Sequence, residues 1–523
     1  MHPRAYRVLI LACLLILLAG GASHMFFGNS DSDTLGVDDA FITYHYAHNL
    51  HRGNGLVFNP GERVEGYSNL SYTLLMSVAF FFTHDMGVYY FSAFLNLLFA
   101  GATLLVFAAF LRERMGDGLG IVGALLFALC LPVWAAVGSG METCLMLLIY
   151  VAIWVVTERL AREEDRRWTR VLCALTILSL LSRADGFLMP GAAIACLMLK
   201  RRMRPALACS ATLVTGAFFY ELWRYHYYGY LLPNTYYTRV TGPLLWRASY
   251  ALAQFHGFAT HGGLLPYLLA FLILGIELAA NWWRKRPTAM EPLGFELFLA
   301  AGWIAYWFFV GGDYIGERFL LILFPLGIFS LLKLVKGTSD KKVVALLAIL
   351  VALFGILPIH WLDHRFHYSM HRYDSRRVTG EFLREHYPGK SVMTDAVGKV
   401  PFLADTYTVD ILGLIDPVIA HAPPATREFD PGHVKFNIDH SLSKKPDLIV
   451  EGLPISGPQD PYWGQDSLQK FKAAGYRLRH LVYTGLREPP EPILNTRDMP
   501  EEAITRSIEE GYNTAILVRD GAD

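Results

Sequence analysis

Two neighbouring carboxylates, Asp38 and Asp39, stand at the start of a polar segment that spans residues 35–72. This segment follows the first apolar run of the chain and is too polar to lie within a bilayer. A carboxylate beside a hydroxyl group can take up its proton as a general base, so both residues are candidate catalytic groups. The alternative is structural, because Asp is also favoured at the N-cap and in the first turn of a helix. We favour catalysis for at least one of them, since the helix predicted at residues 40–50 also carries His45 among other His and Tyr residues.

The composition restricts which elements can position these residues. The chain has 523 residues, of which 53% are hydrophobic and 18% are charged, and its mean hydropathy is +0.32. A soluble core of this length cannot bury so many apolar residues, so we predict a polytopic α-helical membrane protein. The formal net charge of zero argues against nucleic acid as a partner. The six cysteines all lie in or beside apolar runs, which excludes a disulfide framework or a zinc site.

Eleven apolar segments are predicted to cross the membrane, although several are shorter than the roughly 20 residues that a bilayer requires. The first follows Arg4 and Arg7 and resembles a signal peptide, but it lacks a good small-residue cleavage site. We therefore expect an uncleaved span with a cytoplasmic N-terminus. The predicted spans are residues 8–21, 89–110, 119–137, 141–157, 170–183, 186–199, 205–222, 263–281, 295–310, 317–335 and 342–361. Together they form a membrane module at residues 1–363.

The distribution of Lys and Arg predicts the orientation of these spans. With eleven spans, all the basic loops fall on the side of Arg4 and Arg7; they are residues 112–114, 159–170, 200–204, 284–286 and 333–342. If residues 69–83 also crossed, every later basic loop would lie on the wrong side. We therefore predict a juxtamembrane or re-entrant helix there. The Asp pair then faces the periplasm or the cell exterior, in a first outer loop of residues 25–88.

Four later outer loops bring ionisable groups to the same membrane face. They are residues 134–142, 182–186, 223–262 and 310–318. Scattered acidic and basic groups that converge at a membrane surface suggest a site for a phosphate-bearing lipid, because the Arg fork binds phosphate oxygens bidentately. With the first loop, these segments supply the candidate substrate-binding residues His45, Glu65, Tyr67, Glu142, Arg183, Asn234, Tyr236, Arg239, Asp313 and Arg318.

Structural alternatives stay open for several of these residues. Arg183 can pair with Asp185 at a helix junction, and Arg318 can extend its charge to the membrane surface. The residues that follow Pro233 can form only a turn, since Pro-Asn favours one. We interpret Asp185 itself as structural.

Several motifs together resemble a known family. The run VDDAFITYHYAHNLHRGNGLVFNPGERVEGYSN resembles the start of the bacterial terminal arabinofuranosyltransferases, which belong to the GT-C superfamily of membrane glycosyltransferases. The likeness continues through GSGMET, SRADG, PNTYYTR, VGGDYIGERFLL, DAVGKVPF and DILGLIDP. It implies a GT-C core of eleven spans, a catalytic acid in the first periplasmic loop, a polyprenyl-phosphate sugar donor and a C-terminal periplasmic domain.

The predicted reaction moves a monosaccharide, by resemblance arabinofuranose, from a polyprenyl phosphate to a cell-envelope acceptor with inversion. Nucleotide sugars are absent outside the membrane, so a lipid phosphate must be the leaving group. Asp38 is the predicted base, and Asp39 orients it or holds the acceptor. The acceptor can be an envelope polysaccharide, a lipid-linked glycan or a pilin-like protein. We predict that the enzyme lies in the bacterial inner membrane, with its active site in the periplasm.

No cofactor is expected, although Asp38, Glu142 and Asp313 can supply an oxygen site for a divalent metal if their loops converge. The nearest alternative enzyme is an oligosaccharide ligase or polymerase with a polyprenyl-diphosphate donor. A flippase for lipid-linked sugar is a further alternative, but it needs charges near the bilayer centre, whereas the acids here gather in outer loops. A binding or assembly factor with a degenerate fold would tolerate the loss of Asp38.

Residues 364–523 differ in composition, because the apolar runs stop and charge, Pro and Gly rise. Strand-length apolar runs at 390–394, 407–412 and 447–451 and helical patterns at 379–387 and 467–475 predict a small periplasmic α/β domain. The DAVGKVPF and DILGLIDP pieces are interpreted as strand-to-helix turns rather than as acceptor-binding loops.

Overall fold

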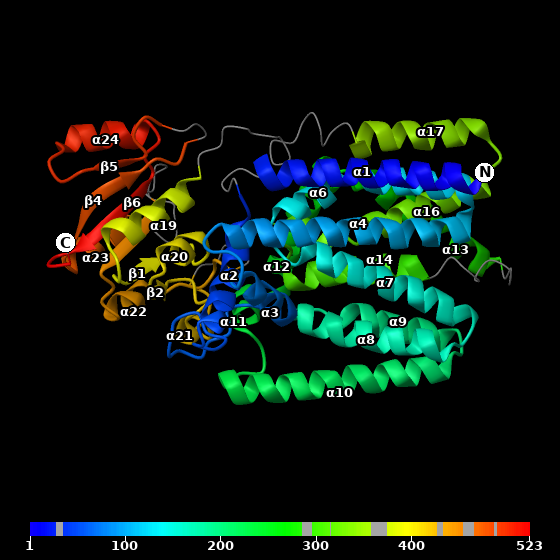
Figure 1. Cartoon of the computed structure of the whole chain (residues 1–523), viewed down its shortest axis with the longest axis horizontal. Coiled ribbons are helices and arrows are strands. Elements are labelled where there is room, and N and C mark those ends of the chain that lie inside the picture. The colour runs from blue at the N-terminus through cyan, green and yellow to red at the C-terminus, as the bar shows by residue number, and fades with distance from the viewer. Residues whose placement is uncertain are drawn as a thin grey trace.

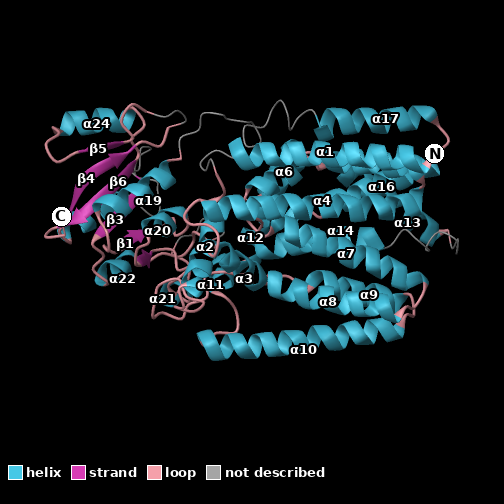
Figure 2. Ribbon diagram, in the orientation of Figure 1, coloured by secondary structure: helices cyan, strands magenta, loops and turns pink. Residues whose placement is uncertain are grey.

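The computed structural model describes residues 1–27, 35–284, 295–313, 315–356, 374–425, 432–452, 465–485 and 489–522. Helices form one elongated body, and a smaller part that contains a β-sheet lies at one end of it (Figures 1 and 2). The C-terminus lies in the sheet part and the N-terminus at the opposite end of the helical body (Figure 1). The predicted boundary between residues 363 and 364 lies outside the described residues.

Most of the longer helices run between the two ends of the body. The helices of this part are α1 (Pro3–Phe27), α4 (Gly87–Met115), α5 (Asp117–Ala128), α6 (Leu131–Gly138), α7 (Thr143–Arg162), α8 (Arg166–Ser182), α9 (Leu188–Leu199), α10 (Met203–Tyr228), α12 (Leu244–His261), α13 (Leu265–Trp283), α14 (Phe295–Val310), α16 (Leu323–Gly337) and α17 (Lys341–Val351). Shorter helices lie in the connections: α2 (Asp38–His51), α3 (Leu70–Ala79), α11 (Asn234–Arg239) and α15 (Gly316–Leu320). Of these, α2, α3 and α11 lie between the helical body and the sheet (Figure 1).

Apolar helices of membrane length support the prediction of a membrane protein. Within the described residues, α1, α4, α7 and α10 are each long and apolar enough to cross a bilayer, and the bent pairs α5–α6 and α12–α13 raise this number from four to six. Shorter apolar helices accompany them at α3, α9, α14 and residues 344–354. Every predicted span falls on helix in the described part of the chain, whereas the count of eleven crossings stays a prediction.

Two predicted features of the helical body can be compared with the structure, whereas the orientation of the spans stays a prediction. Helix α3 has ten residues and is too short to cross a bilayer, as predicted for residues 69–83. At the end opposite the sheet, the amino group of Met1 lies 3.3 Å from Asp117, and Arg112 pairs with the same carboxylate at 2.8 Å. One region differs from expectation, because the predicted outer loop of residues 223–262 contains the 18-residue helix α12, which is bent by 105° from α13.

The C-terminal part is built around a mixed sheet. Its described strands are β1 (Val392–Thr394), β2 (Thr408–Asp410), β3 (Leu448–Gly452), β4 (Tyr476–Val482), β5 (Ile493–Asn495) and β6 (Thr514–Arg519), in the order β2-β1-β3-β6-β4-β5. Strand β1 is parallel to β2 and β3, and β6 is antiparallel to β3 and β4. Its helices are α19 (Ser375–His386), α20 (Lys399–Ala404), α21 (Pro417–Ala420), α22 (Ile438–Ser443), α23 (Gln465–Ala473) and α24 (Glu501–Glu509). DAVGKVPF leads from β1 into α20 and DILGLIDP from β2 to α21, as predicted for strand-to-helix turns.

The two parts of the molecule pack against each other through the first outer loop. The ring of Phe402 in α20 lies 5.6 Å from that of Phe41 and 6.1 Å from that of His48, measured between centroids. The side chain of Asn59 donates a hydrogen bond to the carbonyl of Thr408 and accepts one from its N–H, both at 2.9 Å. The C-terminal part therefore helps to fix the loop that carries the Asp pair.

Candidate active site

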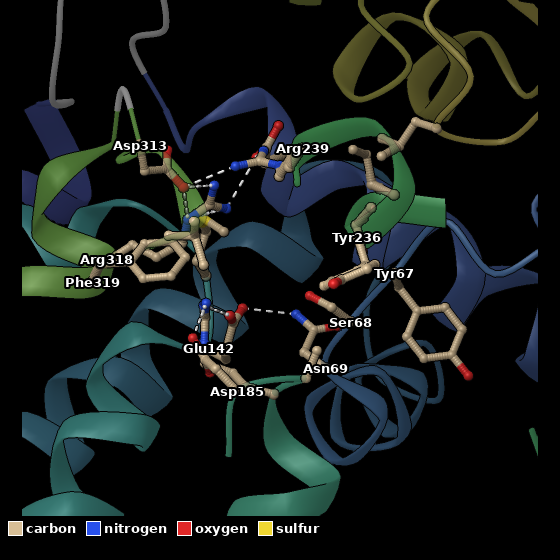
Figure 3. Close-up of a pocket in the computed structure, with 18 of the residues that line it drawn as sticks. Tyr67, Ser68, Asn69, Glu142, Asp185, Tyr236, Arg239, Asp313, Arg318 and Phe319 are labelled. Atoms are coloured by element: carbon tan, nitrogen blue, oxygen red, sulfur yellow. Dashed lines mark hydrogen bonds and ion pairs between the residues drawn. The ribbon is translucent and has the colours of Figure 1, made fainter. Parts of the chain in front are cut away.

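A pocket of about 120 Å³, with charged side chains in its lining, lies where the helical body, the first outer loop and the C-terminal part meet. Its walls come from the start of α2, residues 66–69, the α6–α7 and α8–α9 turns, α11, the end of α14, and residues 312–313 and 318–319. Leu414 of the C-terminal part closes another side. Figure 3 shows charged side chains from several of these segments pointing toward one another.

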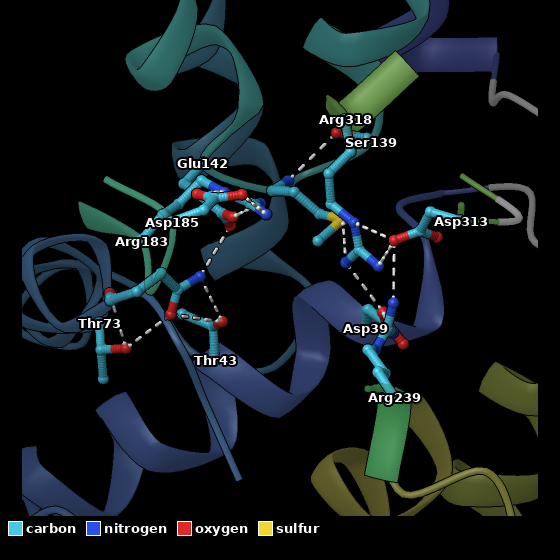
Figure 4. A network of polar contacts seen from close by, with 12 residues as sticks. Asp39, Thr43, Thr73, Ser139, Glu142, Arg183, Asp185, Arg239, Asp313 and Arg318 are labelled. Atoms are coloured by element: carbon cyan, nitrogen blue, oxygen red, sulfur yellow. Dashed lines mark hydrogen bonds and ion pairs between the residues drawn. The ribbon is translucent and has the colours of Figure 1, made fainter. Parts of the chain in front are cut away.

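Asp39 belongs to the first of two ionic clusters in this pocket. Its Oδ2 accepts hydrogen bonds from Arg239 Nη2 and Arg318 Nη1, both at 3.0 Å. Asp313 Oδ2 accepts from the same two side chains, at 2.8 Å from Arg239 Nη1 and 3.0 Å from Arg318 Nε. Asp313 Oδ1 accepts the backbone N–H of Ile315 at 2.9 Å. Two guanidinium groups are thus held between two carboxylates (Figure 4).

Arg183 forms the second cluster. Its Nε and Nη2 donate to the two carboxylate oxygens of Asp185 at 2.8 and 3.0 Å, the bidentate geometry that this pair of groups favours. Its Nη1 donates to Glu142 Oε1 at 2.8 Å. The side-chain amide of Asn69 donates to Glu142 Oε2 at 2.7 Å, and Asn69 Oδ1 accepts from Thr43 at 3.2 Å. This network fixes Arg183 at the wall of the pocket (Figure 4).

The ring of Phe319 lies between the two clusters. The guanidinium carbon of Arg183 lies 4.7 Å from the ring centre, and that of Arg318 lies 5.7 Å from it. Contact with an aromatic ring attracts a cation without neutralising its charge. The pocket therefore has two separate cationic positions, each backed by carboxylates.

The charged side chains differ in their access to solvent. The side chain of Asp39 is 18% exposed. The other acids of the two clusters are between 1% and 3% exposed; they are Asp313, Glu142 and Asp185. Because a base must reach the reacting hydroxyl group, Asp39 is the best placed of these acids. Arg239, at 22%, is the most exposed guanidinium group of the two clusters.

Most of the predicted site residues line this pocket. They are Asp39, Tyr67, Glu142, Arg183, Tyr236, Arg239, Asp313 and Arg318. The first loop and the later outer loops therefore converge, as their predicted placement on one membrane face requires. Asp38, His45, Glu65 and Asn234 lie outside it.

Asp38, which the sequence predicted as the base, faces the C-terminal part instead. Its carboxylate accepts the backbone N–H of Gly398 at 3.1 Å and that of Lys399 at 2.8 Å. Successive side chains of a helix point about 100° apart, so Asp38 and Asp39 do not share a direction. Of the structural alternative, the N-cap part is wrong, because Val37 occupies that position in α2, whereas both acids do lie in the first turn of the helix. Among the Asp pair, the pocket therefore contains Asp39 alone.

His45, Glu65 and Asn234 take part in packing around the pocket. His45 stacks on Phe58 with ring centres 4.1 Å apart, and burial lowers its pKa to about 4, so the ring carries no charge with which to bind phosphate. Burial raises the pKa of Glu65 to about 7, against the opposing effect of Arg224, which lies 2.9 Å away. The backbone N–H of Asn234 donates to the carbonyl of Glu65 at 2.9 Å. These three residues support the walls rather than face a substrate.

The structure adds residues that sequence reasoning left out. Asn69 donates to Glu142, and Asp185, interpreted as structural, lines the pocket and binds Arg183. Asn69 is the last residue of the first-loop run and Asp185 lies in SRADG, so the other residues of these two motifs were the available signal. Phe319 follows Arg318 at the start of an apolar run, where an aromatic residue gives no sign of its role.

Within the described residues, no group of three His, Cys, Asp or Glu side chains is arranged to hold a metal ion. The oxygen site considered for Asp38, Glu142 and Asp313 does not form, because Asp38 lies outside the pocket. The other two acids each pair with arginine. Metal independence stays a prediction.

Comparison with known proteins extends the fold assignment. Residues 366–496 match a family described as a domain of unknown function, DUF8728. ArnT from Cupriavidus metallidurans, solved with undecaprenyl phosphate bound, is similar to this chain with a TM-score of 0.55 and 11% identity, over 99% of this chain and 98% of ArnT. The Archaeoglobus fulgidus oligosaccharyltransferase has a TM-score of 0.54 and 13% identity, over 94% of this chain and 74% of that one. This chain has the GT-C fold.

The GT-C chain also resembles a curated enzyme. The terminal beta-(1->2)-arabinofuranosyltransferase of Mycobacterium tuberculosis (strain H37Rv) is 26% identical over 338 residues, which cover 57% of this chain and 52% of the relative. The resemblance predicted from the first-loop motif is thereby confirmed. The chain spans about half the length of this relative.

Proposed function

We propose that this protein is a membrane glycosyltransferase that moves a monosaccharide from a polyprenyl phosphate to a cell-envelope acceptor, with Asp39 as the general base. One observation carries the proposal: a single pocket holds an accessible carboxylate directly beside an accessible guanidinium group, Asp39 beside Arg239 at 3.0 Å. Transfer from a lipid phosphate needs both groups, one for the acceptor hydroxyl and one for the leaving phosphate. The GT-C fold and the resemblance to a glycosyltransferase support it.

In the proposed reaction, the acceptor hydroxyl oxygen attacks the anomeric carbon of the donor sugar. The bond from that carbon to the phosphate oxygen breaks as the glycosidic bond forms, and the hydroxyl proton passes to Asp39. Such general-base assistance contributes about 10² to 10⁴ in rate. Because the sugar undergoes a single displacement, its anomeric configuration inverts.

The departing phosphate takes the bonding electrons and requires positive charge beside it. Arg239 is the most exposed guanidinium group of the clusters and bonds Asp39, so a phosphate at Arg239 lies next to the base. The phosphate oxygens compete with Asp39 for the same N–H groups, which weakens the ion pair and makes Asp39 a better proton acceptor. Arg318, at 7% exposure, pairs with Asp39 at 3.0 Å and holds it in place.

The second cluster suits the sugar. Arg183, fixed by Asp185 and Glu142, faces the pocket with donors that can bond sugar hydroxyl groups or the phosphate. Tyr236 is 37% exposed and offers an apolar face on which a sugar ring can pack. Donor and acceptor are thus proposed to meet between the two clusters.

The finer assignments follow from the relatives and the charge distribution. We propose arabinofuranose as the sugar because the curated relative is a terminal arabinofuranosyltransferase. The ArnT structure contains undecaprenyl phosphate, which supports a monophosphate lipid as the carrier here. With eleven spans the basic end of the bundle faces the cytoplasm, so the pocket and the sheet part face the periplasm of a bacterial inner membrane. The acceptor is an envelope polysaccharide, a lipid-linked glycan or a pilin-like protein.

Product analysis of the full chain in lipid nanodiscs tests the proposal. With a polyprenyl-phosphoryl arabinofuranose donor and an arabinan oligosaccharide acceptor, we expect a new glycosidic bond and released polyprenyl monophosphate. Transfer that requires a diphosphate donor would instead indicate an oligosaccharide ligase or polymerase. In proteoliposomes, donor that changes leaflet without any product would indicate a flippase.

A further inference from the structure

We infer that Asp38 is a positioning residue, which latches the C-terminal part onto the first outer loop and thereby fixes the direction of Asp39. The latch consists of Asp38, Gly398 and Lys399. The link to Asp39 rests on the proposed function, whereas the latch itself is a structural claim that can be tested without any activity.

The contacts of the Asp38 carboxylate carry the inference. Its Oδ2 accepts the N–H of Gly398 at 3.1 Å and its Oδ1 the N–H of Lys399 at 2.8 Å. Both oxygens therefore bind consecutive backbone amides of a segment 360 residues further along the chain. Hydrogen bonds to an ionised acceptor are about twice as strong as neutral ones. The guanidinium of Arg376, 3.8 Å from Oδ1, adds a weaker attraction.

Lys399 holds the same part of the first loop by a second route. Its side chain is fully buried, and its Nζ donates to the carbonyl of Gly36 at 3.2 Å and to Asp374 at 2.9 Å. A buried ammonium group needs such partners to offset its desolvation. The segment just before α2 is thus attached to the C-terminal part through a backbone carbonyl as well as through the Asp38 carboxylate.

Gly398 allows this close approach because it lacks a side chain. A Cβ atom at this position would lie 2.1 Å from the carbonyl oxygen of Asp38 and 2.4 Å from its Oδ2. Neither distance is sterically possible, and the nearer atom belongs to the backbone. Any larger residue at position 398 must push the two segments apart.

The latch controls Asp39 because the two acids are consecutive in the first turn of α2. When Asp38 moves, the backbone of Asp39 moves with it, and Asp39 must keep two hydrogen bonds of 3.0 Å to remain aligned in the pocket. A misplacement of about 1 Å in a reacting group lowers a rate by about 10². The DAVGKVPF motif, interpreted from sequence as a turn, therefore also docks the C-terminal part.

Amide hydrogen exchange of the full chain in nanodiscs tests the latch directly. In Asp38→Ala and Gly398→Ala, we expect the amides of residues 397–404, except Pro401, which has no N–H, to exchange at least tenfold faster than in the unmodified chain. Asp405→Asn is the matched control, since it removes an exposed pair with Arg52 from the same interface and Asn tolerates the positive φ of 51° at this position. Exchange in this control and in Asp39→Asn should stay unchanged. Unchanged exchange in both latch variants would overturn the inference.

Transfer assays on the same variants test the coupling to Asp39. Gly398→Ala keeps every acid of the pocket, and we expect its kcat to fall at least tenfold while the shape of its pH profile stays the same. Full turnover in Gly398→Ala, despite faster exchange, would refute the coupling. If Asp38→Ala loses turnover while its amide exchange stays normal, Asp38 acts as the base rather than as a positioning residue. If the unmodified chain transfers no sugar, the proposed function fails, and the exchange experiment still decides the latch. Asp38→Asn, which keeps one acceptor oxygen, replaces Asp38→Ala if that variant does not fold.

Discussion

Replacing Arg318 by Lys separates the geometry of the first cluster from its charge. Arg318 bridges two acids, with Nη1 3.0 Å from Asp39 and Nε 3.0 Å from Asp313. A Lys ammonium keeps the positive charge but lacks the planar fork, so it cannot hold both carboxylates in this arrangement. We expect Asp39 to lose one of its anchors and to point less accurately at the acceptor.

The size of the effect follows from the bonds that are lost. A hydrogen bond to a charged group contributes about 1.5–3 kcal/mol. If one such bond at Asp39 is lost, a barrier increase of about 1.5–3 kcal/mol corresponds to a fall in kcat of about 13- to 160-fold. The donor KM should change less than threefold, because Arg318 is 7% exposed and the donor phosphate is proposed to bind at Arg239.

Steady-state transfer kinetics measure this effect. Arg52→Lys is the matched control, because its pair with Asp405 is 47% and 44% exposed and such surface pairs contribute about 0–1 kcal/mol. Its kcat should stay the same. A kcat for Arg318→Lys within threefold of the unmodified enzyme would show that a positive charge alone suffices here and that the guanidinium fork is not needed.

Three further substitutions test other parts of the account. Asp185→Asn removes the bidentate ion pair with Arg183 and should raise the donor KM about tenfold with little change in kcat. An unchanged KM would show that Arg183 does not bind the donor. Asn69→Leu leaves an oxygen of buried Glu142 without its donor and should lower the free energy of unfolding by about 1–3 kcal/mol, measured by thermal unfolding in detergent; equal stability would contradict this. Burial raises the pKa of Asp410 from 3.8 to about 6, and backbone N–H groups oppose the shift. The pKa of the Asp410 carboxyl is higher in the folded chain than in the unfolded chain. The protonated carboxyl therefore stabilises the fold fully below pH 3.8, and this stabilisation of about 3 kcal/mol is lost as the pH rises through 6. Asp410→Asn should therefore lose less stability between pH 4.5 and pH 8 than the unmodified chain, and an identical loss would contradict the assignment.

The sequence predicted the helices and the common face of the loops because both depend on the membrane itself. Apolar segments and the position of Lys and Arg respond to the bilayer, whichever partner each helix has. Placing the loops of Arg239, Asp313 and Arg318 on one face was enough to predict that these residues converge. The sheet, of which six strands are described, was predicted less completely: in β4 the alternation of apolar and polar residues breaks at His480, where the pairing with β6 shifts in register. The described strand β5 has three residues, too few to give a pattern.

The direction of individual polar side chains could not be predicted, because distant partners decide it. Asp38 turns away from the pocket to bind Gly398, which lies 360 residues further along the chain. Glu65 is buried against Arg224 of α10, and His45 is buried against Phe58. In the sequence these residues look as suitable for a substrate as Asp39 does, and only their tertiary contacts distinguish them.

The most direct test of Asp39 as the general base is the turnover of Asp39→Asn in the transfer assay, under saturating polyprenyl-phosphoryl arabinofuranose. The side chain keeps its size but loses the ability to accept a proton, so we predict a fall in kcat of at least about 10² with a folded, lipid-reconstituted chain. A kcat within tenfold of the unmodified enzyme would contradict the assignment of Asp39 as the base.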